Sequence, residues 1–148
     1  MKNKKELFGK IAYASGDIYG GGAFIIVGLL LLVYLTNVEG FSGTLAGIIV
    51  FIGKAWDAVT DPFMGQLSDR TRSRFGRRRI YFLLGSLPVL VSWVMLWYGF
   101  GITGTSAKFI YYTLSYIFFS TAFTIVMVPY NAILSDMIRD YNRRSEFT

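Results

Sequence analysis

Four long apolar stretches, joined by short polar segments, make up most of the sequence. They cover approximately residues 11–36, 43–67, 80–100 and 109–134. Each stretch is roughly 20 residues or longer, which is the length that an α-helix needs to cross a hydrocarbon core of ~30 Å. The pattern therefore predicts an all-α membrane protein with four transmembrane helices.

Basic residues are concentrated at one end of these stretches. The loop between the first and second stretches has no Lys or Arg, and the loop between the third and fourth has only Lys108. The positive-inside rule therefore places both chain ends and the loop 68–79 on the cytoplasmic side of the cell membrane. The basic residues on the cytoplasmic side are Lys2, Lys4, Lys5, Lys10, Arg70, Arg72, Arg74, Arg77, Arg78, Arg79, Arg139, Arg143 and Arg144.

The second stretch carries three charged residues where a membrane-spanning helix is expected to have none. Lys54, Asp57 and Asp61 are spaced i, i+3 and i+7, so they fall within a sector about 60° wide on one face of a helix. Each charge at the centre of a span costs about 2.5–3.5 kcal/mol on insertion scales. We therefore expect these side chains to face protein or a water-filled cavity, as in an ion pathway. The alternative is a purely structural ion pair between Lys54 and Asp57, which leaves Asp61 unexplained.

The opposite face of the second stretch is apolar, and we expect it to face lipid. A helix with one lipid-facing side and one charged side is typical of a pathway enclosed by other helices. The apolar face is formed by Leu45, Ile49, Ile52, Trp56, Val59 and Phe63.

Thr60 and Pro62 add oxygen atoms close to the two carboxylates. Proline has no backbone N–H, so Pro62 leaves the carbonyl of Ala58 without its helical partner. Two carboxylates, a free carbonyl and the Thr60 hydroxyl form a hard, all-oxygen environment, which suits Na⁺ or H⁺ and does not suit a transition metal. A structural kink is the alternative interpretation of Pro62.

Polar positions in the fourth stretch lie on one helical face. Thr124, Met127, Val128 and Asn131 are spaced i, i+3, i+4 and i+7. An isolated threonine in a membrane helix usually bonds its own backbone. The carboxylates of the second stretch nevertheless make Thr124 a candidate site residue.

The first stretch contains Asp17 and a run of three glycines around Gly21. Glycines in membrane helices usually permit close helix packing. The alternative is that they leave room for a substrate beside the helix. Asp17 has two open interpretations, either a functional residue or an acid that faces interfacial water.

The loop 68–79 combines an acid with arginines at a helix end. Asp69 has no use in an orientation signal, so we expect a charge network that latches neighbouring helices and breaks and reforms as the bundle rocks. Gly65 and Gly76 are expected to permit tight turns beside it. The expected latch residues are Gly65, Asp69, Arg70, Arg74, Gly76, Arg77 and Arg78.

Composition excludes several function classes. The 148 residues are 53% hydrophobic and include no Cys and no His. Disulfides, thiolate metal sites and the usual general base are therefore absent, and the polar loops are too short for a catalytic domain. We expect no enzyme activity, no cofactor and no nucleic-acid partner, because the basic residues punctuate membrane spans. The first apolar stretch is too long for a cleaved signal peptide.

The motifs resemble one family when they are taken together. Residues 54–65 (KAWDAVTDPFMG) and 68–79 (SDRTRSRFGRRR) are similar to the glycoside–pentoside–hexuronide:cation symporters, the melibiose-permease-like branch of the major facilitator superfamily. The pair Gly16-Asp17 and residues 129–143 (PYNAILSDMIRDYNR) also fit.

The resemblance implies a twelve-helix fold of two six-helix bundles with alternating access. Residues 1–148 would then hold the first four helices of the N-terminal bundle. The chain ends where the family enters its fifth helix, so we expect a truncated part of a longer transporter, whose missing helices would be its partners. Alone, half a bundle is not expected to transport.

The resemblance also implies roles for individual residues. Asp57 and Asp61 match the acids that bind the coupling Na⁺, H⁺ or Li⁺, and Thr60 and Thr124 match polar residues of the same site. The sugar site fits less well. The melibiose-type members hold the sugar with two acids and an aromatic side chain, and these positions fall at Gly21, Met127 and Asn131. A pentoside, a hexuronide or another glycoside is therefore expected rather than melibiose.

Two other functions fit the length of the chain. The length would suit a complete four-helix protein, such as a dimeric small multidrug exporter. Those exporters, however, depend on an acid in the first helix, and many have nearly balanced charge on the two sides of the membrane. A non-transporting interaction protein gives no reason for two intramembrane carboxylates on one helix face. The sequence favours a cation-coupled sugar or glycoside symporter over both.

Overall fold

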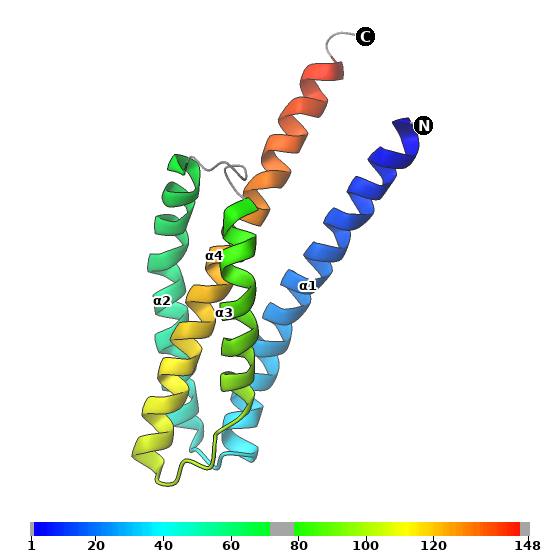
Figure 1. Ribbon diagram of the computed structural model, residues 1–148. Helices are drawn as coiled ribbons and strands as arrows, with labels where there is room; N and C mark the ends of the chain where they lie inside the picture. The colour runs from blue at the N-terminus through cyan, green and yellow to red at the C-terminus, as the bar shows by residue number, and fades with distance from the viewer. Residues whose placement is uncertain (1, 72–78, 146–148) are drawn as a thin grey trace. The chain divides into compact units, whose positions relative to one another are not determined.

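The computed structural model describes residues 2–71 and 79–145, and the side chains of residues 20–71 and 80–132. The described residues form the helices α1 (Lys2–Asn37), α2 (Gly43–Arg70), α3 (Arg79–Trp97) and α4 (Thr105–Ser145) (Figure 1). All four are long and apolar enough to cross a membrane. The prediction of an all-α membrane protein with four such helices is confirmed.

The turn between α3 and α4 explains why α3 ends at Trp97, before the end of the predicted span. Phe100 and Gly101 have positive φ angles of 47° and 68°, which an α-helix cannot contain. The Tyr111 hydroxyl of α4 lies 2.9 Å from the carbonyl oxygens of Met95 and Tyr98 and donates to them. It thereby satisfies carbonyls near the end of α3 that lack helical partners.

The chain divides into two compact units, Met1–Gly47 and Ile48–Thr148. In the first unit, α1 ends in a sharp turn. The backbone N–H of Phe41 donates to the carbonyl of Leu35 over 3.0 Å, and Gly40 has a φ of 75°. Because this conformation strains any residue with a Cβ, glycine is the residue that suits the turn.

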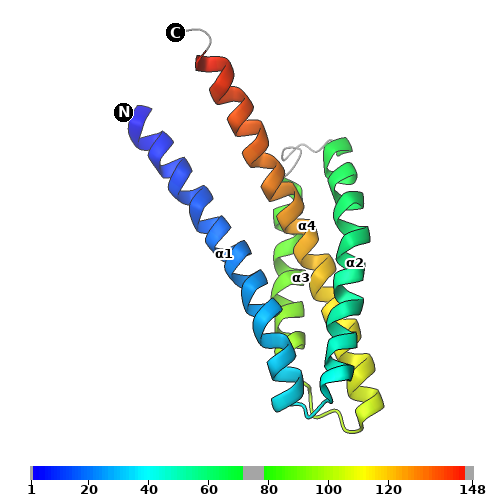
Figure 2. The ribbon, with the colours of Figure 1, turned by 180° about the vertical axis from the view of Figure 1, so that it is seen from behind.

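The second unit contains most of α2 together with α3 and α4. Helices α2 and α4 run in the same direction, and α3 runs opposite to both (Figures 1 and 2). Helix α4 packs closely against α3, because a Cβ on Gly85 would lie only 2.4 Å from a methyl carbon of Val126. The rings of Trp93 and Phe119 also pack there, with centroids 5.7 Å apart. The candidate site lies where α4 meets its other neighbour, α2.

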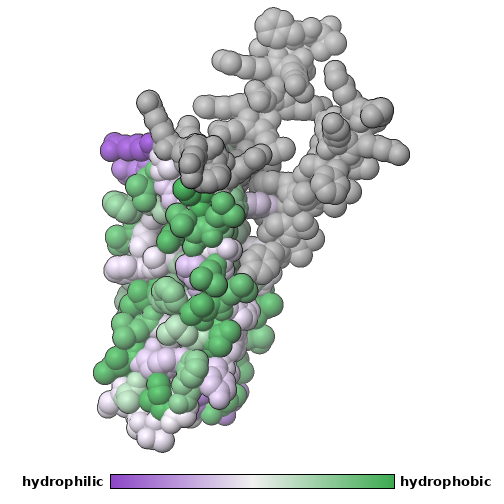
Figure 3. Space-filling model, viewed as in Figure 1, coloured by the Kyte–Doolittle hydropathy of each residue, from purple (hydrophilic) through white to green (hydrophobic). Residues whose placement is uncertain are grey.

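Hydrophobic side chains extend along the described surface, and hydrophilic side chains gather at the end of α2 that leads into residues 72–78 (Figure 3). Val59 and Phe63 are each 68% exposed, as expected for a lipid-facing side. The expectation that this whole face meets lipid is wrong at Ile49, which is buried. Ile49 precedes Gly53 by four residues and so lies on the same ridge of α2, the ridge that meets α4 at Gly53.

Candidate cation site between α2 and α4

Asp57 is held by partners from two helices. Its Oδ2 atom lies 3.3 Å from the Nζ atom of Lys54, three residues earlier in α2. Its Oδ1 atom accepts a hydrogen bond from the hydroxyl of Ser120 in α4. The side chain of Asp57 is 16% exposed, whereas that of Lys54 is 40% exposed. The predicted ion pair is present, and α4 adds a bond to the other carboxylate oxygen.

Asp61 lies one turn further along α2 and also bonds to α4. The Thr124 hydroxyl donates to its Oδ1 atom over 2.7 Å. Thr124 is buried, whereas Asp61 is exposed in the described part of the chain. Thr124 thus bonds across helices and not to its own backbone, which is the alternative that a lone threonine usually takes.

Contacts between α2 and α4 follow one register. The two hydrogen-bonded pairs are each separated by 63 residues in the chain, and two glycine contacts have the same separation. Successive pairs are four residues apart on both helices, so one ridge of α2 meets one ridge of α4. A glycine lies at each end of this seam. The four pairs are Gly53–Tyr116, Asp57–Ser120, Asp61–Thr124 and Gly65–Val128.

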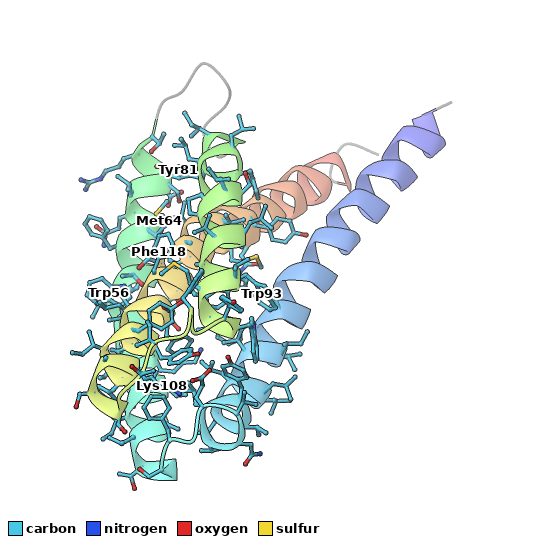
Figure 4. All side chains as sticks on the ribbon, turned by 60° about the horizontal axis from the view of Figure 1, so that its bottom comes forward. Trp56, Met64, Tyr81, Trp93, Lys108 and Phe118 are labelled. Carbon is cyan, nitrogen blue, oxygen red and sulfur yellow. The ribbon has the colours of Figure 1, made fainter. Side chains whose placement is uncertain are left out.

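A fifth contact fixes the side of α2 next to this seam. The indole N–H of Trp56 donates to the Thr121 hydroxyl over 2.8 Å. The Thr121 hydroxyl in turn donates to the carbonyl of Ile117 in its own helix over 2.8 Å. Trp56, labelled in Figure 4, is 42% exposed, so one polar atom anchors an otherwise outward-facing ring. Neighbouring residues of α2 are therefore bonded to neighbouring residues of α4.

The arrangement presents oxygen ligands and a small net charge. Lys54, Asp57 and Asp61 together carry one negative charge when ionised, which one monovalent cation would neutralise. Within the described residues, no group of three His, Cys, Asp or Glu side chains could hold a metal ion. Carboxylate and hydroxyl oxygens are hard ligands, which suit an alkali cation or a proton.

Thr60 is not brought to the carboxylates by its hydrogen bonds. Its hydroxyl donates to the carbonyl of Trp56 over 3.0 Å, and the carbonyl of Asp57 lies 3.5 Å away. Pro62 lies inside α2, which continues to Arg70. The polar residue between the acids therefore bonds the helix backbone, as an isolated threonine commonly does.

The residues expected near a sugar are spread over both units. Gly21 is exposed with no atom within 4 Å of an added Cβ, and it belongs to the first unit. Met127 is partly buried and Asn131 is exposed on α4, in the second unit. Asp17 lies in α1, but its side chain is outside the described residues.

The expected latch is only partly described. Asp69 and Arg70 are exposed in the last turn of α2. The expected turn at Gly65 is wrong, because Gly65 lies inside α2, where its lack of a side chain leaves space beside Val128. The remaining expected latch residues, Arg74, Gly76, Arg77 and Arg78, lie outside the described residues.

The ends of α2 and α3 beside this loop are joined by side chains. The Thr71 hydroxyl is hydrogen-bonded to the hydroxyl of Tyr81, which is labelled near the start of α3 in Figure 4. The Thr71 hydroxyl also lies 2.8 Å from the carbonyl oxygen of Leu67. This bond was not anticipated from the sequence.

Sequence reasoning also missed Ser120 and Thr121. A signal for Ser120 was present, since Ser120 and Thr124 have the same i, i+4 spacing as Asp57 and Asp61. Two acids and two hydroxyls at equal spacing can pair one to one across parallel helices. The direction of α4 relative to α2 was needed to recognise the match.

The model of the family described as MFS/sugar transport protein matches residues 12–148. An uncharacterized symporter of Synechocystis sp. is 37% identical over 92% of this chain, and a putative glycoside/cation symporter of Escherichia coli is 36% identical over 91%. A sodium-dependent lysophosphatidylcholine symporter of Danio rerio is 31% identical over 99% of this chain. The chain spans only 26–29% of the length of these relatives.

These similarities confirm the resemblance drawn from the motifs. The match lies in the N-terminal part of the symporters. The matched family consists of transporters, so the expectation that the chain is not an enzyme is confirmed as well. The chain is a multi-pass membrane protein.

Proposed function

Because this chain belongs to the MFS/sugar transport protein family, we propose that it forms part of a cation-coupled symporter. The transporter uses secondary active transport by alternating access, and Asp57 and Asp61 bind the coupling ion, either Na⁺ or H⁺. The Thr124 hydroxyl assists them, with Thr60 at the edge of the site and Lys54 as the charge partner of Asp57. The helices that close the pathway are supplied by the rest of the same transporter.

One observation carries this proposal. Two carboxylates one turn apart in α2 each accept a hydrogen bond from a hydroxyl of α4. A charged side chain inside a membrane is costly and is retained where it contacts an ion or a partner. Two acids with one lysine leave a negative charge that a single monovalent cation neutralises. The names of the relatives, which include a glycoside/cation symporter and a sodium-dependent symporter, support the same interpretation.

The proposed substrate is a sugar or glycoside. The name of the Escherichia coli relative supports it. The positions expected to contact the sugar are Gly21, Met127 and Asn131, with Asp17 nearby. Because the relatives also include lysophosphatidylcholine symporters, a lysophospholipid is tested in parallel.

The orientation and gating follow from charge. Both chain ends and the loop 68–79 lie on the cytoplasmic side of the cell membrane, by the distribution of Lys and Arg. Asp69 and Arg70, together with the arginines of that loop, act as a latch that holds neighbouring helices in one state of the alternating cycle.

Uptake into proteoliposomes tests the function. The complete transporter that contains this chain is reconstituted, and uptake of radiolabelled glycosides or of lysophosphatidylcholine is measured with an imposed Na⁺ gradient, an imposed H⁺ gradient or neither. We expect a gradient of one ion to drive glycoside uptake, and Asp57→Asn to abolish the response. Glu39→Gln is the matched control, because Glu39 lies after α1 and bonds the Tyr34 hydroxyl over 3.0 Å.

The outcomes separate the parts of the proposal. Uptake that responds to neither gradient contradicts ion coupling. A response that survives Asp57→Asn leaves the symporter standing but removes Asp57 from the site. Uptake of lysophosphatidylcholine without uptake of any glycoside overturns the proposed substrate alone.

A further inference from the structure

We propose that Ser120 of α4 is a further residue of the cation site, a positioning residue that orients Asp57 and thereby sets the affinity for the coupling cation. This inference rests on the proposed function. It assigns a role to a residue that the sequence motifs did not single out. The bond from the Ser120 hydroxyl to Asp57 Oδ1 is the starting observation.

Two partners act on the Asp57 carboxylate from different helices. Lys54 holds Oδ2 from three residues earlier in the same helix, while Ser120 holds Oδ1 from α4. The other acid, Asp61, lies four residues later in α2. Without Ser120, the contacts described for Asp57 reduce to the ion pair with Lys54, on the side of Asp57 away from Asp61. The bond from Ser120 therefore keeps the Oδ1 atom of Asp57 from rotating toward Lys54.

Water cannot easily replace this hydroxyl. Ser120 is only 5% exposed, and Tyr116, one turn earlier in α4, is 2% exposed. The Tyr116 ring lies against Gly53, where an added Cβ would be 2.1 Å from ring carbons. A carboxylate that loses a buried donor and gains no water loses the bond outright. Among the described residues, the hydroxyl of Ser120 is the α4 donor that bonds Asp57 Oδ1.

Ser120 differs from most other hydroxyls in α3 and α4. Ser92 and Thr113 donate to carbonyls of their own helices, over 2.9 and 2.7 Å. The Ser115 hydroxyl is buried and makes no hydrogen bond within the described residues. Ser120 and Thr124 instead donate across to α2, one to each acid. The geometry gives Ser120 the same relation to Asp57 that Thr124 has to Asp61.

The neighbouring contact keeps Ser120 in register. Thr121 accepts the indole N–H of Trp56, so two consecutive residues of α4 bond two consecutive residues of α2. A rotation of either helix about its axis would break at least one of these bonds. The position of the Ser120 hydroxyl therefore depends on how α2 and α4 are packed together, and not only on the rotamer of Ser120.

Equilibrium binding of Na⁺ tests the role. The complete transporter is purified, and NaCl is titrated calorimetrically against a choline chloride blank, with proton uptake followed by a pH indicator as a separate arm. We expect Ser120→Ala to weaken cation affinity by about tenfold, as for loss of a hydrogen bond to a charged group. Ser120→Thr keeps the hydroxyl and should retain the wild-type affinity. Ser115→Ala removes a buried hydroxyl that bonds nothing described, and should change nothing.

The controls separate this inference from the proposed function. If the wild type neither binds Na⁺ nor takes up protons, the proposed function fails, and the role of Ser120 fails with it. If the wild type binds the ion, Asp61→Asn abolishes binding and Ser120→Ala binds normally, only the role of Ser120 is overturned. A lower melting temperature with unchanged affinity has the same meaning. Should Ser120→Ala not fold, Ser120→Cys keeps the size with a weaker donor and should lose affinity in the same direction.

Discussion

Helix α4 meets its two neighbours in different ways. On the side of α2, hydroxyls of α4 donate to two carboxylates. On the side of α3, rings and methyl groups pack together, such as Trp93 with Phe119 and Gly85 with Val126. The Tyr111 hydroxyl also bonds there, but to backbone carbonyls. In both seams a glycine leaves room for a side chain of the other helix, Gly53 for Tyr116 and Gly85 for Val126. They differ in whether polar side chains of one helix bond side chains of the other.

The difference separates packing from function. In a membrane, apolar helices associate mainly through close packing of small residues, and no charge is needed. The α3 seam shows that this chain has such an interface. The acids of the α2 seam are therefore not required for helix association, and their cost calls for another explanation. The proposed binding of a coupling cation would supply it.

Among the variants that leave both acids in place, the largest expected effect comes from closing the space at Gly53. An alanine Cβ would lie 2.1 Å from the Tyr116 ring, so the ring or the helix must move. Overpacking of this kind costs about 1–3 kcal/mol of stability. Because the Asp57–Ser120 pair is one turn away, we expect Gly53→Ala to weaken Na⁺ affinity by more than about tenfold, the factor that 1.4 kcal/mol represents. Calorimetric titration and thermal unfolding measure both effects.

The matched control for Gly53 lies in the same helix. Gly47 has no atom within 4 Å of an added Cβ. Gly47→Ala should therefore leave Na⁺ affinity unchanged. Equal losses in the two variants would mean that helix flexibility, and not the contact with Tyr116, is what matters.

The next effect tests the bond between Thr124 and Asp61. Thr124→Val keeps the shape and removes the hydroxyl that donates over 2.7 Å. A hydrogen bond to a charged group contributes about 1.5–3 kcal/mol, so we expect Na⁺ affinity to fall by roughly tenfold or more. Thr124→Ser should retain most of it. A valine variant that binds Na⁺ as tightly as the serine variant would exclude the hydroxyl from the site.

A smaller effect is expected at Trp56. Trp56→Phe keeps an aromatic ring and removes the N–H that donates to Thr121. A neutral hydrogen bond contributes about 0.5–1.5 kcal/mol, which corresponds to a loss of Na⁺ affinity of about twofold to tenfold. Tyr98→Phe is the control, since Tyr98 is an exposed aromatic residue outside the site. A loss as large as that of Thr124→Val would mean that Trp56 does more than hold the register.

The smallest effect on binding is expected from the α3 seam. Gly85→Ala brings a Cβ within 2.4 Å of Val126 and 3.3 Å of Ile125, so the protein should unfold at a lower temperature. We expect Na⁺ affinity to remain at the wild-type value, because no acid lies in this seam among the described residues. Reduced affinity in a folded Gly85→Ala protein would show that the two seams are coupled, and would weaken the distinction drawn above.

The helices themselves were predictable because their lengths and polarity are fixed by the bilayer. Asp57 and Asp61 were also evident, since a charged residue inside an apolar stretch can be recognised without knowing how the helix is rotated or aligned against its neighbours. Helix ends were less so. Helix α3 ends at Trp97, ahead of the turn in which Phe100 and Gly101 adopt positive φ, and the sequence GFGITG does not reveal which residue does so first.

The partners of the acids could not be predicted with the same certainty. Thr124 was considered because of its helical face, while Ser120 was overlooked among neighbouring serines and threonines that bond their own backbones. Thr60, which the resemblance placed in the site, donates to Trp56 instead. Which hydroxyl crosses to another helix depends on the rotation and register of two helices, and a single sequence specifies neither.

The most direct measurement is ion-driven uptake by Asp61→Asn in the complete transporter. The account predicts that wild-type proteoliposomes accumulate substrate when a Na⁺ or an H⁺ gradient is imposed, and that Asp61→Asn responds to neither gradient although the protein is folded and in the membrane. An Asp61→Asn transporter that accumulates substrate as the wild type does would contradict the claim that the α2 acids and the α4 hydroxyls form the coupling site.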